Sequence, residues 1–460
     1  MNKIDKRHEI LTEPFAKLII KLCVPAIIGM IIIALYSFMD SIYAGQMISK
    51  YAMAAIGIAY PFTLINNSIS VLFGMGGASV LSRAIGARDE YHKQSVLPSV
   101  SFLVIISSLI ITVVGYCATE WFVQLANPSP EIAKNTIQYL KIIFLGSVFI
   151  NLTQALNMLM RAEGRMIRAM SIMCSGALLN IILDPIFILL FPSLGVQAVA
   201  YATIISQIFQ CVLTLIYFLY QSPQIKWKKP HLYPGMAKAI IPIGISGMIM
   251  QFATMIQQTL LFQTAGTYGG ETYQIILSAL LRIQMFAFIP LWGASQGFQP
   301  FVGTNFGAKQ YLRLLQGRRA FMLFAFLLSL VFFLPMQIIP HHIVSWFIDD
   351  PSLVQKAIYP ARAIFSTFFL YGFLALLGIY FQAIGHAKTA AIFVMGRNLI
   401  LFIPVVLLLP KIFGAPALWW TFACCDLPII IYIFVVYIRH GQQLKALSND
   451  SAADISFATK

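Results

Sequence analysis

A chain of 460 residues with 59% hydrophobic and 10% charged residues, and a mean hydropathy of +0.81, is far too apolar for a soluble globular protein. The net charge of +15 would suit nucleic acid, but the basic residues alternate with long apolar runs, so we expect no nucleic-acid partner. The six cysteines lie within apolar segments without CxxC spacing, which argues against a structural metal or a disulfide framework.

The first apolar stretch, residues 15–45, is long enough to cross a bilayer as a helix. It carries Pro25 near its start and Asp40 near its far end. A carboxylate inside a span costs about 2.5–3.5 kcal/mol on insertion scales, so Asp40 is a candidate functional group. Pro25 removes a backbone donor and can bend the helix. We therefore predict a retained first span that can bend and that buries a titratable group.

Eleven further apolar segments follow, mostly joined by short loops. We predict twelve spans, at residues 15–45, 51–80, 95–119, 135–160, 169–191, 196–220, 237–265, 271–302, 319–339, 354–381, 391–413 and 415–439. The predicted fold class is an all-α integral membrane protein. The polar stretch 221–236, which holds three prolines and a lysine cluster, divides the chain. This gives an N-lobe (1–220), a cytoplasmic linker (221–236), a C-lobe (237–440) and a cytoplasmic tail (441–460).

The basic residues predict the orientation. With a cytoplasmic N-terminus, 23 of the 31 Lys and Arg residues fall in cytoplasmic loops and termini, and four fall in the opposite loops. The positive-inside rule therefore predicts that both termini are cytoplasmic. Most of the +15 charge then reflects topology, and a small part attracts anionic membrane lipids.

The two halves resemble each other. A shift of 221 residues superimposes Gly76 on Gly297, Gly86 on Gly307, Arg88 on Lys309, Ala162 on Ala383 and Gly164 on Gly385. Six spans per repeat is an even number, so both halves enter the membrane in the same orientation. The pattern predicts two parallel six-helix repeats around a central cavity, which is typical of transporters.

The GAR and GAK loops at 86–88 and 307–309, the repeated Pro25 and Pro242, Asp40, and NIILDPIFIL at 180–189 together resemble the multidrug and toxic compound extrusion (MATE) family. The resemblance covers essentially the whole chain, from about residue 14 to residue 439. It implies a secondary-active exporter that exchanges cations inward for drugs outward and alternates between inward- and outward-facing states. Within the family, the chain is most similar to prokaryotic members with an acidic site in the N-lobe.

Asn180 and Asp184 are four residues apart and share one helix face. Pro185 follows and lacks an N–H, which can free a carbonyl in the preceding turn. With Asp40 on another helix, two carboxylates and an amide can converge in one pocket, where the acids share a proton or hold Na⁺. The family resemblance adds Tyr36, Tyr139, Asn157 and Thr203 to this predicted cation-coupling cluster. The alternative is that Asp184 only forms hydrogen bonds within the lobe.

The C-lobe departs from sodium-coupled relatives that carry an acid in the seventh span. Here that span holds Gln257 and Gln258, which cannot be titrated. The intramembrane acid of this lobe is Asp426, and we predict that it forms a structural charge pair with Arg282 or Arg397. A second coupling site at Asp426 is the alternative.

We therefore expect a multidrug antiporter in the bacterial inner membrane that exports amphipathic cationic or aromatic drugs in exchange for H⁺, with no cofactor and no enzymatic activity. We expect a monomer. The alternatives are Na⁺ coupling and a lipid-linked oligosaccharide flippase of the same superfamily. A flippase should line its cavity with basic residues to hold a pyrophosphate, whereas four basic residues lie within spans here: Lys141, Arg282, Arg362 and Arg397. An ion channel should instead carry a symmetric ring of charges.

Overall fold

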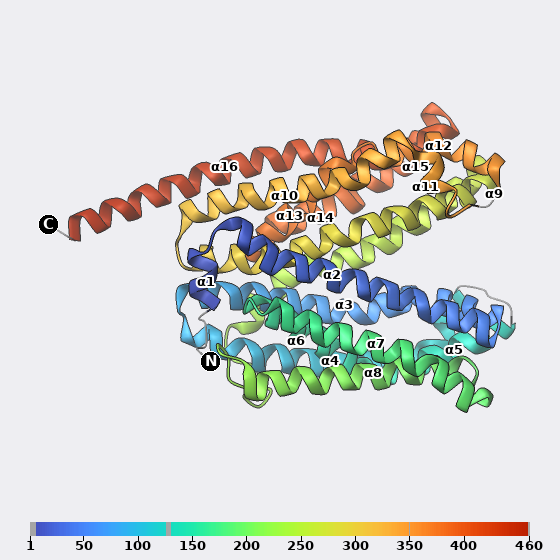
Figure 1. Ribbon diagram of the computed structural model, residues 1–460, viewed down its shortest axis with the longest axis horizontal. Coiled ribbons are helices and arrows are strands. Elements are labelled where there is room, and N and C mark those ends of the chain that lie inside the picture. The colour runs from blue at the N-terminus through green and yellow to red at the C-terminus, as the bar shows by residue number, and fades with distance from the viewer. Residues whose placement is uncertain (1–5, 126–129, 349, 459–460) are drawn as a thin grey trace. The chain divides into compact units, whose positions relative to one another are not determined.

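The structure, a computed structural model, describes residues 6–125, 130–348 and 350–458 (Figure 1). These residues form helices and turns without a strand, which confirms the predicted all-α class. The α-helices run as follows: α1 Lys6–Thr12, α2 Phe15–Tyr43, α3 Lys50–Ala87, α4 Glu90–Leu125, α5 Pro130–Leu145, α6 Ser147–Ala162, α7 Met166–Leu190, α8 Val196–Ile216, α9 Met236–Gly307, α10 Tyr311–Ile338, α11 Pro340–Val344, α12 Pro351–Phe365, α13 Tyr371–Ala383, α14 Ala387–Met395, α15 Phe402–Phe413 and α16 Thr421–Ala458.

The predicted spans correspond to long helices in the described part of the chain. Ten helical segments are long and apolar enough to cross a membrane, of which one joins α12 to α13 (Pro351–Ala383) and one joins α14 to α15 (Ala387–Phe413). The pair α5 and α6, bent by 56°, gives an eleventh. The longest helix, α9, contains two predicted spans, because Gly270 adopts non-helical angles (φ 61°, ψ −155°) that only glycine accepts readily. The twelve predicted spans are therefore accounted for.

The internal repeat is visible in the backbone. Arg88 and Lys309, 221 residues apart, both adopt φ 57° in the turn that follows a helix. Gly164 and Gly385, separated by the same shift, have φ 76° and 85°. Each pair ends a helix with the same return hydrogen bonds from the following residues to carbonyls in the last turn. The predicted shift of 221 thus relates equivalent turns as well as equivalent letters.

The chain forms two compact units. Unit 1 comprises Met1–Arg7 and Ile28–Gln251, and unit 2 comprises His8–Ile27 and Phe252–Lys460. The boundaries at 27/28 and 251/252 therefore lie inside α2 and α9. This division differs from the predicted lobes, because the start of α2 belongs to unit 2 and the start of α9 belongs to unit 1.

Glycines explain this exchange of segments. In unit 1, a Cβ on Gly76 of α3 would lie 2.2 Å from the carbonyl oxygen of Ile240, so only glycine lets α9 pack this closely. In unit 2, a Cβ on Gly297 would lie 2.7 Å from the carbonyl oxygen of Leu22 in α2. Gly76 and Gly297 are equivalent positions of the repeat. Each half of the chain therefore receives the first part of the other half's first long helix.

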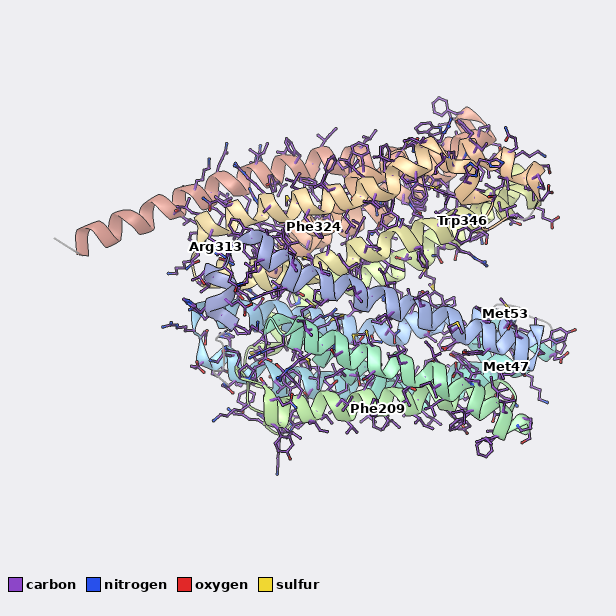
Figure 2. The ribbon with its side chains drawn as sticks, in the orientation of Figure 1. Met47, Met53, Phe209, Arg313, Phe324 and Trp346 are labelled. Atoms are coloured by element: carbon purple, nitrogen blue, oxygen red, sulfur yellow. The ribbon has the colours of Figure 1, made fainter. Side chains whose placement is uncertain are left out.

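The predicted linker, 221–236, lies within unit 1 and is hydrogen-bonded to α4. The Gln94 side chain donates to the carbonyl of Gln224 at 3.1 Å, and the backbone N–H of Tyr233 donates to Ser99 Oγ at 3.2 Å. The stretch is therefore part of unit 1 in the structure, and not a free connection between two lobes. In unit 2, Arg313, labelled in Figure 2, donates to the backbone carbonyls of Ile10 and Glu13.

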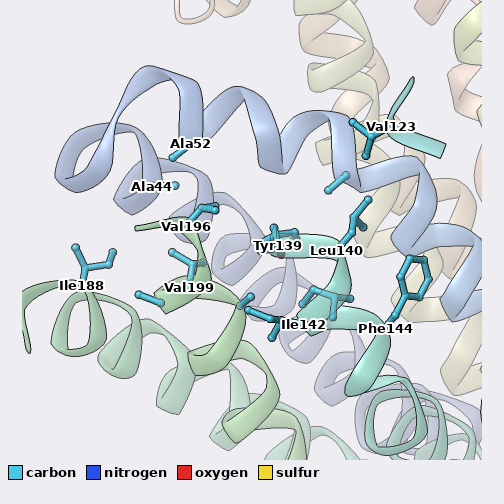
Figure 3. Packing of buried hydrophobic residues seen from close by; sticks show 14 of the residues in the cluster. Ala44, Ala52, Val123, Tyr139, Leu140, Ile142, Phe144, Ile188, Val196 and Val199 are labelled. Atoms are coloured by element: carbon cyan, nitrogen blue, oxygen red, sulfur yellow. The ribbon is translucent and has the colours of Figure 1, made fainter. Parts of the chain in front are cut away.

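An apolar cluster fills one end of unit 1 (Figure 3). Small residues such as Ala52 on α3 let neighbouring helices approach, and Val196 and Val199 of α8 pack into the space that remains. Tyr139 of α5 is buried as a member of this cluster. The cluster therefore forms an apolar wall beside the polar groups of the same unit.

Candidate functional site

The helix α7 presents Asn180 and Asp184 one turn apart on one buried face, as their spacing predicts. Asn180 Nδ2 donates to Asp184 Oδ1 at 3.2 Å. Pro185 lies inside α7 and lacks an N–H, so it cannot donate to the backbone carbonyl of Ile181 four residues earlier. The helix thus supplies a carboxylate, an amide and a weakened backbone ladder within two turns.

The neighbouring helix α8 contributes Thr203 to this face. Its hydroxyl donates to the carbonyl of Val199 at 3.0 Å, and its oxygen lies 3.4 Å from Asn180 Nδ2. The amide nitrogen of Asn180 is therefore oriented toward both Thr203 and Asp184. The amide oxygen of Asn180, Oδ1, forms neither of these two contacts.

Asp40 reaches the same place from α2 and is 6% exposed. Its carboxyl group is close enough to that of Asp184 for a side-chain hydrogen bond, and Tyr139 of α5 interacts electrostatically with both acids. The structure thus brings together Asp40, Tyr139, Asn180, Asp184 and Thr203, from four helices of unit 1. We call these five residues the acid pocket.

Several oxygens of the acid pocket lack a donor. Asp40 Oδ1, Asn180 Oδ1 and Asp184 Oδ2 are buried and have no hydrogen-bond partner among the described residues. A buried polar atom normally has a partner, because losing water without replacement costs about 1–3 kcal/mol. The pocket therefore presents acceptors suited to a proton, a small cation or water.

Two predicted members of the cluster stand apart. Asn157 of α6 is buried, and its amide donates to the carbonyl of Ala169 at 2.8 Å, which ties α6 to the first turn of α7. No hydrogen bond joins it to the acid pair in the described structure. The side chain of Tyr36 lies outside the described residues. Pro25 lies inside α2, two residues before the boundary between the units, and its role as a bend stays a prediction.

The C-lobe acid has a different environment. Asp426 Oδ1 accepts a hydrogen bond from Arg397 Nε at 2.7 Å, and its Oδ2 accepts one from Thr367 at 2.8 Å. Arg397 also donates to Asn398 Oδ1 at 3.2 Å, and that oxygen accepts from Gln257 at 3.3 Å. Both oxygens of Asp426 are thus satisfied within unit 2. The other predicted partner, Arg282, lines a separate cavity with Glu271.

Sequence reasoning missed Glu163, which follows α6. This residue is 2% exposed and accepts hydrogen bonds from Tyr217 at 2.5 Å and Ser222 at 2.6 Å. Burial raises the pKa of Glu163 to about 7, although these hydrogen bonds and Arg165 oppose the rise. The signal in the sequence was a lone acid within the basic loop RAEGR. In the described part of the chain, no group of three or more His, Cys, Asp or Glu side chains is arranged to hold a metal.

The chain has relatives over nearly its whole length. It is 27% identical to the multidrug export protein MepA of Staphylococcus haemolyticus (strain JCSC1435), over 90% of this chain and 91% of that protein. It is 26% identical to MepA of Staphylococcus aureus (strain MRSA252), over 93% and 95%.

Solved structures share the fold. The MATE multidrug transporter DinF-BH, solved with a bound ligand, has a TM-score of 0.85 and 30% identity, over 92% of this chain and 95% of that one. An outward-facing multidrug resistance MATE family transporter of the MOP superfamily has a TM-score of 0.88 and 23% identity, over 97% and 100%. The MatE family model matches residues 25–186 and 242–408, more than half of the chain. With its helices, its repeat and these matches together, the chain is a multi-pass membrane protein that belongs to the MatE family.

Proposed function

We propose that this protein is a secondary-active multidrug antiporter that exports amphipathic cationic or aromatic compounds in exchange for H⁺. The observation that carries the proposal is the acid pocket, where Asp40 and Asp184 adjoin each other and present oxygens without a donor. Two adjacent carboxylates in a dry pocket are more stable when they share a proton. Loading and release of that proton would then bias unit 1 between two arrangements as the protein alternates access to the two sides of the membrane.

The substrate class rests on the relatives. The MepA proteins are named multidrug export proteins, and DinF-BH is named a multidrug transporter. The contacts of basic residues argue against an anionic lipid-linked substrate. Arg397 is bonded to Asp426, and Lys141 lies 2.8 Å from Glu120, so two of the four basic residues within spans are already neutralised. We propose a bacterial inner-membrane location with both termini cytoplasmic, as the charge pattern predicts.

The test is efflux of a fluorescent cationic compound from proteoliposomes under separately imposed pH and Na⁺ gradients. A pH gradient alone should drive efflux, and Asp40→Asn should reduce it to the level of protein-free liposomes. Asparagine keeps the size and hydrogen-bonding capacity of the side chain but cannot exchange a proton. Normal efflux by a well-inserted Asp40→Asn protein would overturn the proposal.

A second variant separates H⁺ from Na⁺. Sodium needs about five or six oxygens around it, and Asn180 supplies one of the few neutral ones here, whereas a proton needs a single carboxylate. Asn180→Leu should therefore weaken efflux and shift its pH optimum in a proton-coupled protein, with Na⁺ still without effect. Efflux driven by a Na⁺ gradient at constant pH, and weakened by Asn180→Leu, would instead identify a sodium-coupled antiporter.

A further inference from the structure

A cavity of about 510 Å³ lies within unit 2, far along the chain from the acid pocket. One wall is α9 just after the Gly270 break, where Glu271, Ile275 and Arg282 lie on one face of the helix. The other wall is formed by Phe347, Ile348 and Asp350, which lie between α11 and α12, and by Leu353 in the first turn of α12. The volume falls within the range of small-molecule sites, about 300–1,000 Å³.

The apolar part of the cavity comes from both walls. Ile275 on α9 and Phe347 on the loop are 39% and 44% exposed, so both offer surface to a ligand. Ile348 is 6% exposed and anchors the loop against the protein, while its neighbour Trp346 stands out at 80% exposure (Figure 2). An aromatic or aliphatic body can therefore lie between the helix and an anchored loop.

The cavity also carries both signs of charge. Glu271 and Arg282 are eleven residues apart, which places their Cα atoms about 16 Å apart along α9. Within the described residues, neither forms a salt bridge. Asp350 Oδ1 accepts a hydrogen bond from the backbone N–H of Ser352 at 2.8 Å, which fixes the carboxylate at the start of α12. The Ser352 side chain, and after it this backbone N–H, hold the pKa of Asp350 below its usual value, so this acid is ionised at neutral pH.

We propose that this cavity binds amphipathic zwitterions, with an ammonium group at the Glu271 and Asp350 carboxylates, a carboxylate at Arg282, and an apolar body between Ile275 and Phe347. The planar guanidinium of Arg282 suits a carboxylate, because its N–H groups can bind both oxygens. A purely cationic compound would leave Arg282 unpartnered, and a purely anionic one would leave the acids unpartnered. The site is independent of the proposed export mechanism and is tested without any gradient.

Three fluorescent probes test the charge requirement on the purified full-length protein in detergent. Nα-dansyl-lysine carries both charges, dansylcadaverine is the same molecule without the carboxylate, and Nα-dansyl-norleucine lacks the ammonium group. The dansyl fluorescence rises in an apolar site. Glu271, Arg282 and Asp350 are exposed, and each exposed charge contact changes affinity by up to about fivefold, so we expect Nα-dansyl-lysine to bind several times more tightly than either partner probe.

Two variants should each weaken the binding of a different pair of probes. Arg282→Gln should weaken Nα-dansyl-lysine and Nα-dansyl-norleucine up to about fivefold and leave dansylcadaverine unchanged. Glu271→Gln should weaken Nα-dansyl-lysine and dansylcadaverine and leave Nα-dansyl-norleucine unchanged. Arg362→Gln and Glu131→Gln remove exposed charges elsewhere and serve as matched controls. If the wild type bound all three probes equally tightly, and neither Arg282→Gln nor Glu271→Gln changed any of these affinities, the proposal would be overturned.

The apolar wall gives a check that does not depend on charge. Phe347→Ala removes an exposed ring and should weaken all three probes, and it serves if Arg282→Gln fails to fold. Unaltered binding of all three would also overturn the proposal.

Phosphatidylethanolamine has the same two charges on an apolar body, so it is added to the micelles, with phosphatidylglycerol as control. Displacement of Nα-dansyl-lysine by phosphatidylethanolamine alone would identify a lipid as an occupant, and undiminished binding would assign the site to free compounds.

Discussion

The buried acids Asp40, Asp184 and Asp426 differ in how their oxygens are satisfied. Asp426 has both oxygens bonded, to Arg397 and Thr367. Asp40 Oδ1 and Asp184 Oδ2 have no donor in the described structure. A satisfied charge pair holds helices together, whereas unsatisfied acceptors leave room for an exchangeable ion. The two kinds of site should respond differently to loss of charge.

We expect Asp426→Asn to lower the free energy of unfolding by about 3 kcal/mol, because it leaves the Arg397 guanidinium without its carboxylate in a buried setting. The yield of monodisperse protein after detergent extraction measures the loss. Arg397→Gln added to Asp426→Asn should restore part of the yield. Arg282→Gln added to Asp426→Asn should not restore the yield, since Arg282 lines the cavity beside Glu271 and is not bonded to Asp426. Normal yield combined with lost ion coupling would instead make Asp426 a second ion site.

Glu163 should make stability depend on pH. An ordinary glutamate has a pKa of about 4.3, and burial raises that of Glu163 to about 7. Between these values the folded protein holds a proton that the unfolded chain has released, so stability falls as pH rises from about 4.3 to 7 and then levels off. This pH-dependent part of the free energy of unfolding amounts to roughly 2–4 kcal/mol. We expect it to be absent from Glu163→Gln, because glutamine cannot ionise.

The measurement is the melting temperature in detergent at pH 5 and pH 8, at one scan rate. The melting temperature of the wild type should fall more between pH 5 and pH 8 than that of Glu163→Gln. Glu131→Gln, an exposed change on α5, should follow the wild type. Equal pH dependence of the wild type and Glu163→Gln would show that the carboxyl does not carry the effect.

At this scale the sequence predicted spacing but not orientation. The four-residue interval of Asn180 and Asp184 sufficed to place them on one face. Tyr139 and Thr203 came from family resemblance, because many polar residues share such intervals along spans. The choice between Arg397 and Arg282 depends on how each helix is rotated in the lobe, and hydropathy does not report rotation.

At the scale of the helix, close packing depends on single glycines. We expect Gly76→Ala to destabilise the protein by about 1–3 kcal/mol, because the new Cβ would lie 2.2 Å from the Ile240 carbonyl oxygen and force α9 away from α3. Gly57→Ala, in the same helix but with nothing within 4 Å, should be neutral or raise stability by up to about 1 kcal/mol. Melting temperatures of the two variants measure the difference. Equal effects would mean that α9 does not need this contact.

The spans were predictable because apolar length is a strong signal, and most helices begin and end within a few residues of the expected bounds. Breaks inside helices were harder. Residues 15–35 of α2 pass as one membrane span, yet the boundary between the units lies within them. Nothing in the apolar composition marks that point. The exchange depends on which neighbours Gly76 and Gly297 admit, which is a property of packing.

At the scale of the whole chain, the division into units predicts how it can be cut. A fragment of residues 28–251 contains all of unit 1 beyond its first few residues, whereas residues 1–220 lack the part of α9 that covers Gly76. We expect the 28–251 fragment to be the more protease-resistant of the two in detergent, although it starts in the middle of α2. Limited proteolysis of both fragments is the measurement. Greater resistance of residues 1–220 would favour the boundaries predicted from the sequence.

The exchange of residues 8–27 and 236–251 between the two halves of the chain also affects the order in which the protein can fold during synthesis. Residues 8–27 are synthesised early, but their packing partners Gly293 and Gly297 follow about 270 residues later, which at about 5–20 residues/s is a delay of roughly 15–55 s. Unit 1 waits in a similar way for residues 236–251. During that interval the first part of the first span, up to Ile27, lacks the side chains of unit 2 that will pack against it. Residues 8–27 are therefore a segment where we expect insertion factors that shelter single helices to act.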